Sequence, residues 1–178
     1  MLSKNHLCQL FFGMEWVCFC DLLPYLDLCT YVLFSGDNCC HSFSMGAIKL
    51  MLEKAIPGVH VHSLMIGQSP NEDTLNGFFK SVDHQINIAC DLIKNDKKLA
   101  NGYNAIGFSQ GGQFLRAVSQ ICPQGMQNLI SFGGQHQGVY GLPDCNAAHI
   151  VCDYIRRLLN YGAYTSWVQS KLVQAQYW

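Results

Sequence analysis

Short apolar or β-branched runs alternate, from about residue 36 onward, with longer stretches in which apolar residues recur every three or four positions. This alternation is typical of βαβ units that build a parallel sheet covered by helices. The runs predict strands at residues 59–66, 103–108 and 128–132. The pattern therefore predicts an α/β fold, and the layering continues without a domain break.

Two helices are predicted between these strands. Ser69 is placed to cap the first helix, Pro70 suits its first turn, and Glu72 can close a capping box. The spacing favours one long helix whose core face is Leu75, Phe78, Val82, Ile86, Ala89 and Ile93. The second helix is expected over 113–122, with inward-facing Phe114, Leu115, Val118 and Ile121.

The C-terminal residues form two further apolar stripes at helical spacing. The first predicts a helix that begins near 150 and ends at Tyr161-Gly162, with the stripe Ile150, Val151, Tyr154, Ile155, Leu158 and Leu159. The second begins a helix with Trp167, Val168, Leu172, Val173 and Ala175. Ordinary core packing is the simplest role for most of these side chains.

Residues 1–35 differ from the rest of the chain. Lys4 and the apolar run 7–20 resemble a signal peptide, but Glu15 interrupts the run and no small-residue cleavage site follows. The alternative is an unstructured segment with no folded role. Charged residues and a proline break every window long enough to span a bilayer. We therefore divide the chain into a divergent segment, 1–35, and a partial α/β domain, 36–178, in which 144–178 is a helical insertion.

Composition narrows the function classes. Eleven Lys and Arg balance twelve Asp and Glu, so charge gives no reason to expect a nucleic-acid partner. Apolar residues make up 49% of the chain, which argues against disorder. Ten cysteines without a CxxC motif favour disulfides and an oxidising compartment, although no Asn-x-Ser/Thr sequon supports secretion.

One motif indicates a catalytic site. The residues 107–111 form G-x-S-x-G between a predicted strand and a predicted helix. This context is typical of a nucleophile elbow, where glycines allow a sharp turn and the serine projects over the sheet edge. Ser109 is therefore the predicted nucleophile, and the backbone N–H of Gln110 is a predicted oxyanion donor. A chance occurrence of this short motif is the competing explanation.

Residues 102–117 and 133–138, together with the rest of 36–178, resemble the palmitoyl-protein thioesterase family. The resemblance implies an α/β-hydrolase fold, and the removal of palmitate and other long-chain acyl groups from cysteines of S-acylated proteins in the lysosome. It implies neither a metal nor an organic cofactor. It assigns Ser109 as nucleophile and Gln110 as oxyanion donor, and it implies the disulfides Cys39-Cys40, Cys90-Cys122 and Cys145-Cys152. It also makes 144–178 part of an insertion that walls an acyl groove.

The residues alone leave two of these cysteine assignments open. Adjacent cysteines close a strained ring, so the residues alone favour two separate partners or free thiols for Cys39 and Cys40. Cys145, His149 and Cys152 also offer three metal ligands, but their spacing is unusual and a fourth ligand is missing.

Two departures from the family pattern affect the expected activity. The family has His-Gly-x-Gly-Asp after the first strand, where this chain has residues 33–37 with Ser35 at the second oxyanion-donor position. Neither the family's catalytic acid nor its base has a match after Ser109. The histidines there are His136 and His149, and the acids are Asp144 and Asp153.

His136 is the candidate replacement base, and a hydrogen bond from its ring to the backbone is the alternative. We expect the chain to end before the remaining triad residues and the last strands, which leaves an unpaired sheet edge. Two hypotheses follow. One is a thioesterase that uses Ser109, and the other is an inactive truncated form that binds at most a lipid or a partner through 150–178.

His60 and His62 alternate along a predicted strand and so share one of its faces. They offer two metal contacts, but the sequence shows no third ligand. A polar strand edge is the expected role, and the mixed-charge run 94–98 is expected to be a solvated loop.

Overall fold

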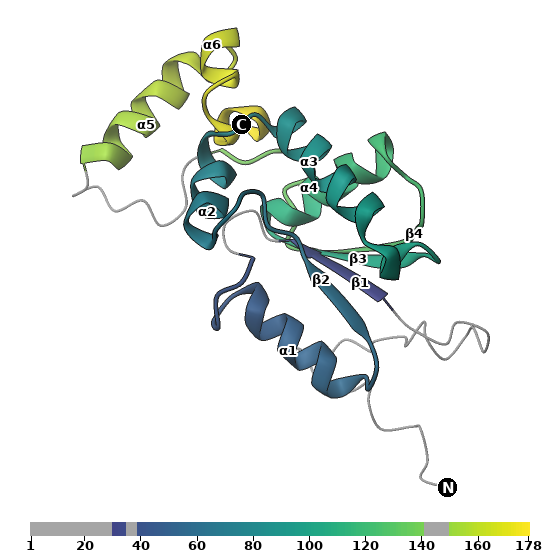
Figure 1. Cartoon of the computed structure of the whole chain (residues 1–178). Helices are drawn as coiled ribbons and strands as arrows, with labels where there is room; N and C mark the ends of the chain where they lie inside the picture. Colours follow the sequence, from purple (N-terminus) through teal and green to yellow (C-terminus); the bar gives the residue numbers. More distant parts are fainter. Residues whose placement is uncertain (1–29, 35–38, 141–149) are drawn as a thin grey trace, which may run out of the picture.

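The computed structural model describes residues 30–34, 39–140 and 150–178 (Figure 1). The strands are β1 (Thr30–Phe34), β2 (His60–Ser63), β3 (Tyr103–Phe108) and β4 (Met126–Phe132). The α-helices are α1 (Met45–Ala55), α2 (Pro70–Phe79), α3 (Val82–Asn95), α4 (Gln110–Ile121), α5 (Ile150–Gly162) and α6 (Ser166–Gln169). Two 3₁₀ turns, η2 (Lys97–Leu99) and η3 (Val173–Tyr177), complete the described elements.

The four strands form one sheet in the order β2-β1-β3-β4, and every described pair is parallel. Helices α3 and α4 cover one face of the sheet, and α1 covers the other (Figure 1). The predicted α/β class is thus confirmed. The strand 103–108 has the predicted bounds, β4 begins two residues earlier than predicted, and β2 is shorter than 59–66. Strand β1 begins at Thr30, upstream of the boundary drawn at residue 36.

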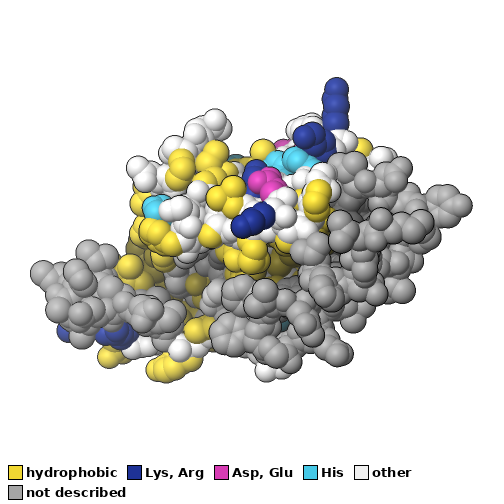
Figure 2. Space-filling view, turned by 90° about the horizontal axis from the view of Figure 1, so that it is seen from below, with side chains coloured by type: hydrophobic (Ala, Val, Ile, Leu, Met, Phe, Trp, Pro, Cys, Tyr) yellow, Lys and Arg dark blue, Asp and Glu magenta, His cyan; other side chains and the backbone are white. Residues whose placement is uncertain are grey.

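The main core lies between the sheet and the α3–α4 layer. Leu115 and Val118 of α4 are fully buried there, and the ring of Phe114 lies 4.3 Å from that of Phe34. On the opposite face, α1 leaves apolar residues such as Leu50 exposed beside the Lys49–Glu53 ion pair. Figure 2 shows this mixture of hydrophobic and charged side chains on one face of the molecule.

The prediction of one long helix after Ser69 is wrong in one respect, because the structure has two helices there, α2 and α3. Lys80 has extended backbone, and Ser81, with φ −45° and ψ 133°, is not helical either. The buried Gln85 side chain stabilises the break by donating to the carbonyls of Asn76 and Lys80. Leu75 and Phe78 are consequently exposed instead of lying on the core face.

The predicted start of α2 is confirmed. The Ser69 side chain accepts a hydrogen bond from the Glu72 N–H, and Pro70 is the first helical residue. Glu72 in turn accepts from the backbone N–H of Gln68, one residue before the expected partner. The helix start is therefore specified locally, as the sequence indicates.

The inward direction predicted for Ile121 is also wrong, and two members of the C-terminal stripes are exposed instead of packed in the core. Ile121 is 58% exposed at the end of α4, Tyr154 is 63% exposed on α5, and Trp167 is 60% exposed on α6. The helix predicted from Trp167 is instead the one-turn α6 followed by η3. Leu159, Val168, Leu172 and Ala175 of the two stripes pack on one another in a cluster that also includes Ala163, and the side chains of Ile150 and Val151 lie outside the described residues.

Within the described residues, no helix is both long and apolar enough to cross a bilayer.

The disulfide Cys90–Cys122 ties α3 to the residue that ends α4. It joins residues 32 positions apart, with the Cα atoms 6.1 Å from one another. A cross-link of this span restricts the unfolded chain and stabilises the fold by about 2–4 kcal/mol. The helical layer on this face is thus held covalently as well as by packing.

We predict that the double substitution Cys90→Ser/Cys122→Ser lowers the free energy of unfolding by about 2–4 kcal/mol. Urea denaturation followed by circular dichroism measures this loss. The matched control is Cys39→Ser/Cys40→Ser, which removes a disulfide between adjacent residues. Because that bridge closes almost no loop, its removal is expected to cost clearly less. Equal losses in the two variants would contradict the prediction.

Candidate active site at the carboxyl edge of the sheet

Ser109 lies at a sharp turn between β3 and α4. Its backbone has φ 53° and ψ −123°, and it is the one non-glycine residue with positive φ in the described ranges. Such a conformation is costly and persists where the surroundings hold it in place. The side chain is exposed at the carboxyl edge of the central strand. The strand–turn–helix context predicted for the motif is therefore present.

Two glycines allow this turn. A Cβ on Gly107 would lie 2.4 Å from the carbonyl oxygen of Gly111, and one on Gly112 would lie 2.2 Å from Ser131 Oγ. The first clash is with backbone, which cannot move aside without displacing α4 from β3. The sequence argument for glycine at the first position of the motif is thus supported by geometry.

The start of α4 faces the same edge. Gln110 is the first helical residue, and the first N–H groups of a helix have no acceptor one turn earlier. The N–H of Ser109 is occupied, because it donates to Phe132 O at 2.7 Å. That bond also fixes the end of β4 beside the turn. A partial positive charge therefore lies next to the Ser109 hydroxyl.

His136 is paired with a different serine. Its Nε2 lies 2.8 Å from Ser131 Oγ, so the expected hydrogen bond from the ring to the backbone is not what the structure shows. The other ring nitrogen, Nδ1, is buried and has no hydrogen-bond partner among the residues that the structure describes. A general base needs a partner on that nitrogen to fix its tautomer and orientation. The geometry therefore does not support His136 as the base for Ser109.

The segment that follows residues 35–38 is anchored by α2 and β2. The buried carboxylate of Asp73 accepts from the backbone N–H groups of Cys39, at 2.9 Å, and Ile66. Ser63 donates to Cys39 O at 2.6 Å. The disulfide Cys39–Cys40 is present at this point, so the expectation from the residues alone, of separate partners or free thiols, is wrong. Sequence analysis missed Asp73, which resembles any other acidic residue in the first turn of a helix.

Several candidate residues lie outside the described part of the chain. They are Ser35, Asp144, His149, Cys145 and the side chains of Cys152 and Asp153. The disulfide Cys145-Cys152 and the second oxyanion donor therefore stay predictions.

Exposed apolar residues of α2 lie near the nucleophile turn. The Gln110 side chain reaches Gly77 O at 3.4 Å, which brings α2 next to the start of α4. Phe78 and Phe79 follow that glycine in the chain and are exposed, with ring centroids 6.2 Å apart. A hollow between the start of α3 and α6 has polar walls that include Ser81, Asp83 and Ser166. Of these two surfaces, the one on α2 is apolar enough to receive a hydrocarbon chain.

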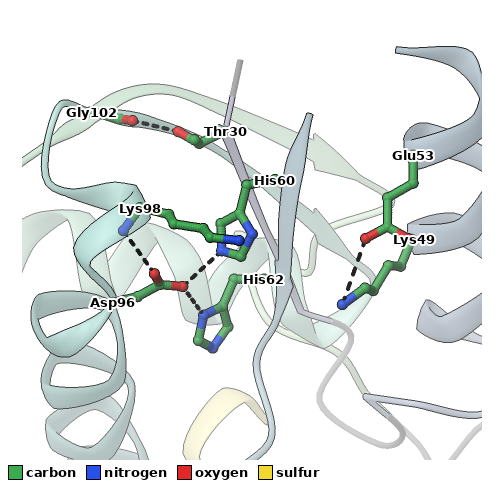
Figure 3. A network of polar contacts seen from close by, with 8 residues as sticks. All are labelled: Thr30, Lys49, Glu53, His60, His62, Asp96, Lys98 and Gly102. Atoms are coloured by element: carbon green, nitrogen blue, oxygen red, sulfur yellow. Dashed lines mark hydrogen bonds and ion pairs between the residues drawn. The ribbon is translucent and has the colours of Figure 1, made fainter. Parts of the chain in front are cut away.

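A polar cluster at the opposite edge of the sheet joins β2 to the end of α3. Both His60 Nε2, at 2.8 Å, and His62 Nδ1, at 2.7 Å, donate to Asp96 Oδ2 (Figure 3). Burial acts to raise the pKa of the Asp96 carboxyl. Hydrogen bonds from His62, His60 and the Lys98 N–H have the larger combined effect and lower the pKa below its usual value, to about 2. The sequence showed the two histidines on one face and missed Asp96, which is 34 residues away from His62.

Comparison with known proteins decides the family. Residues 31–178 match the family described as palmitoyl protein thioesterase. The chain belongs to this family. A palmitoyl-protein thioesterase 1 from Caenorhabditis elegans is 55% identical over 144 residues, which cover 80% of this chain and 48% of that protein.

Other members of the palmitoyl protein thioesterase family match the same region. Palmitoyl-protein thioesterase 3 from Dictyostelium discoideum is 34% identical, with 76% of this chain and 44% of that protein covered. A Schizosaccharomyces pombe protein named palmitoyl-protein thioesterase-dolichyl pyrophosphate phosphatase fusion 1 is also 34% identical, over 77% of this chain and 22% of its own length. The chain thus spans about half, or less, of the length of these curated relatives.

Among solved structures, a monoacylglycerol lipase from Paleococcus ferrophilus aligns with a TM-score of 0.46 and 17% sequence identity. The alignment covers 78% of this chain and 47% of the lipase.

We predict that Gly107→Ala disrupts the turn, because the added methyl group meets the Gly111 backbone. The expected loss in the free energy of unfolding is about 1–3 kcal/mol, the usual cost of overpacking. The control is Gly162→Ala, whose Cβ would make an ordinary 3.4 Å contact with Val168. Thermal unfolding of both variants measures the difference, and equal stability would contradict the proposed close approach.

Asp73→Ala is expected to destabilise the protein by about 1–3 kcal/mol, because two buried N–H groups lose their acceptor. Asp73→Asn keeps one acceptor oxygen and should lose less. Asp91→Ala, at an exposed position of α3, should change stability by less than about 0.5 kcal/mol. Urea unfolding of the three variants gives the ranking, and an Asp73→Ala value equal to that of Asp91→Ala would be the contrary result.

Proposed function

We propose that this chain carries the nucleophile of a serine thioesterase that removes palmitate and similar acyl groups from cysteines of proteins. The observation that carries the proposal is the exposed Ser109 at a positive-φ turn before α4, in a chain of the palmitoyl protein thioesterase family. Relatives named as palmitoyl-protein thioesterases support the substrate class.

The chemistry assigned to Ser109 is acyl transfer in two steps. Its Oγ loses its proton as it bonds to the thioester carbonyl carbon, the resulting oxyanion collapses with cleavage of the carbon–sulfur bond, and the leaving cysteine thiolate takes up that proton. Water then cleaves the acyl-serine ester and releases the fatty acid. The N–H of Gln110, aided by the dipole of α4, stabilises the oxyanion in both steps, and Ser35 is the proposed position of the second donor.

The general base is left unassigned in this proposal. In hydrolases of this kind the acid and the base follow the serine in the chain. His136 is the one histidine after Ser109 in the described ranges, and its ring is held by Ser131 with no carboxylate on Nδ1. The proposal therefore rests on the nucleophile and the oxyanion donor.

The acyl chain is assigned to the exposed apolar side of α2. Leu75, Phe78 and Phe79 are exposed there, and Gly77 contacts the Gln110 side chain. Burying such side chains under a hydrocarbon chain is favourable by about 25 cal/mol per Å². An oxidising compartment such as the lysosome suits the two disulfides, Cys39–Cys40 and Cys90–Cys122.

We predict that purified chain releases palmitate from an S-palmitoyl peptide and that Ser109→Ala lowers kcat by about 10⁶-fold. Release of fatty acid, followed by mass spectrometry, is the measurement. Ser119→Ala is the matched control, because that serine lies near the end of α4 that is far from the turn and is assigned no role in the reaction. Activity that survives Ser109→Ala would overturn the assignment of the nucleophile.

His136→Gln separates two versions of the reaction. Unchanged kcat places the base elsewhere, as the ring geometry indicates, whereas a loss as large as that of Ser109→Ala makes His136 the base. A folded chain that binds palmitate without hydrolysing its thioester would contradict the proposal and favour the inactive, lipid-binding alternative.

A further inference from the structure

His60, His62 and Asp96 bring three metal-ligating side chains to one point. Their candidate ligand atoms all lie within 4.8 Å of one another. Strand β2 supplies both histidines and is paired with β1 from His60 to Ser63. Asp96 directly follows the last residue of α3 (Figure 3). The three side chains therefore project from elements whose relative position is already fixed by the sheet and the core.

The donor set is the kind that zinc prefers. Two imidazole nitrogens and one carboxylate oxygen are a common protein set for Zn²⁺, with water in the fourth position. Mg²⁺ and Ca²⁺ select oxygen ligands and fit this set poorly. The nitrogens that face Asp96 carry protons in the present hydrogen bonds, and a bound ion would displace those protons.

The dimensions are close to those that zinc needs. The two nitrogens lie 2.8 and 2.7 Å from Asp96 Oδ2, whereas ligands about 2.0–2.1 Å from a tetrahedral zinc are about 3.3 Å apart. Small side-chain rotations supply this widening. The side chains of His60, His62 and Asp96 are 22%, 23% and 16% exposed, so an ion and a water molecule can reach the point from solvent.

A further hydrogen bond orients the carboxylate. The N–H of Lys98 donates to Asp96 Oδ1 at 2.9 Å, which leaves Oδ2 for the histidines. Bonds of this kind, behind a ligand, fix its geometry and commonly strengthen metal binding by about 10–100-fold. One group opposes a cation, because the exposed Lys98 side chain extends toward His60 (Figure 3).

We propose that His60, His62 and Asp96 form a zinc site that fastens β2 to the connection between α3 and β3. The site lies at the amino edge of the sheet, since His60 pairs with the first residue of β1, whereas Ser109 follows the carboxyl end of β3. It is separate from the carboxyl edge of the sheet, and it does not depend on the reaction assigned to Ser109. Strand β2 is an outer strand of the described sheet, where a cross-link adds most.

The test titrates metal-free full chain with Zn²⁺ by calorimetry and with Co²⁺ by visible absorption. We expect one ion bound at this site per chain, Co²⁺ bands of a nitrogen–oxygen site, and a melting temperature that rises by several degrees with Zn²⁺ and not with Mg²⁺. His60→Gln, His62→Gln and Asp96→Asn should each weaken binding at least about 10-fold. Circular dichroism without metal shows whether each variant is folded.

Two controls make the result specific. His84→Gln removes an exposed histidine of α3 that is outside the cluster and should leave binding unchanged. Lys98→Gln removes the opposing charge, retains the backbone N–H, and should tighten binding. The proposal is overturned if folded wild-type chain shows no Zn²⁺ binding in the micromolar range, or if folded His60→Gln/His62→Gln chain binds as tightly as wild type.

Discussion

The close approach of Gly107 to the backbone of Gly111 and Gly112 is the constraint on which the rest of the site depends. It lets α4 begin directly against the end of β3, and the chain reverses within one residue. That residue is Ser109, which takes up the backbone strain with φ 53°. The hydrogen bond from Ser109 N to Phe132 O also fixes the end of β4 beside this turn. A serine in any looser turn would neither project over the edge nor stand beside the first N–H groups of a helix.

Strain at one residue persists because the elements on both sides are deeply packed. Five of the six residues of β3 are buried, and Leu115 and Val118 of α4 are fully buried against the sheet. The disulfide from Cys90 to Cys122 holds the far end of α4 to α3. A strained conformation that costs about 1–3 kcal/mol is small beside the burial of such side chains, at about 1.5–3 kcal/mol each. The turn is therefore a consequence of how β3 and α4 pack.

Features that depend on residues close together in the chain could be predicted from the sequence. The strand at 103–108, the Ser69 cap and the nucleophile turn follow from residues next to one another in the sequence. The break between α2 and α3 was not predictable from periodicity, because the apolar spacing stays in phase across it and the carbonyls at the break are satisfied by Gln85.

Ile121 shows a second limit of what apolar periodicity can predict. A helical stripe identifies a face, but not whether another element lies opposite each position on it. Asp73 and Asp96 were missed because their partners are in other elements.

Those two carboxylates explain how the outer strand β2 is held. Asp73 binds the N–H groups of Ile66 and Cys39 beyond its carboxyl end, and Asp96 binds His60 and His62 near its amino end. An outer strand of the described sheet has a hydrogen-bonded neighbour on one side, so contacts at its ends contribute more than they would in a central strand. Because these two sets of hydrogen bonds lie at opposite edges of the sheet, a structural change at the amino edge can affect Ser109 only by way of the strands between them. The carboxyl edge can thus contain the strained turn, while contacts at the amino edge stabilise β2. The histidine cluster is therefore the place where β2 can bind a ligand without altering the turn.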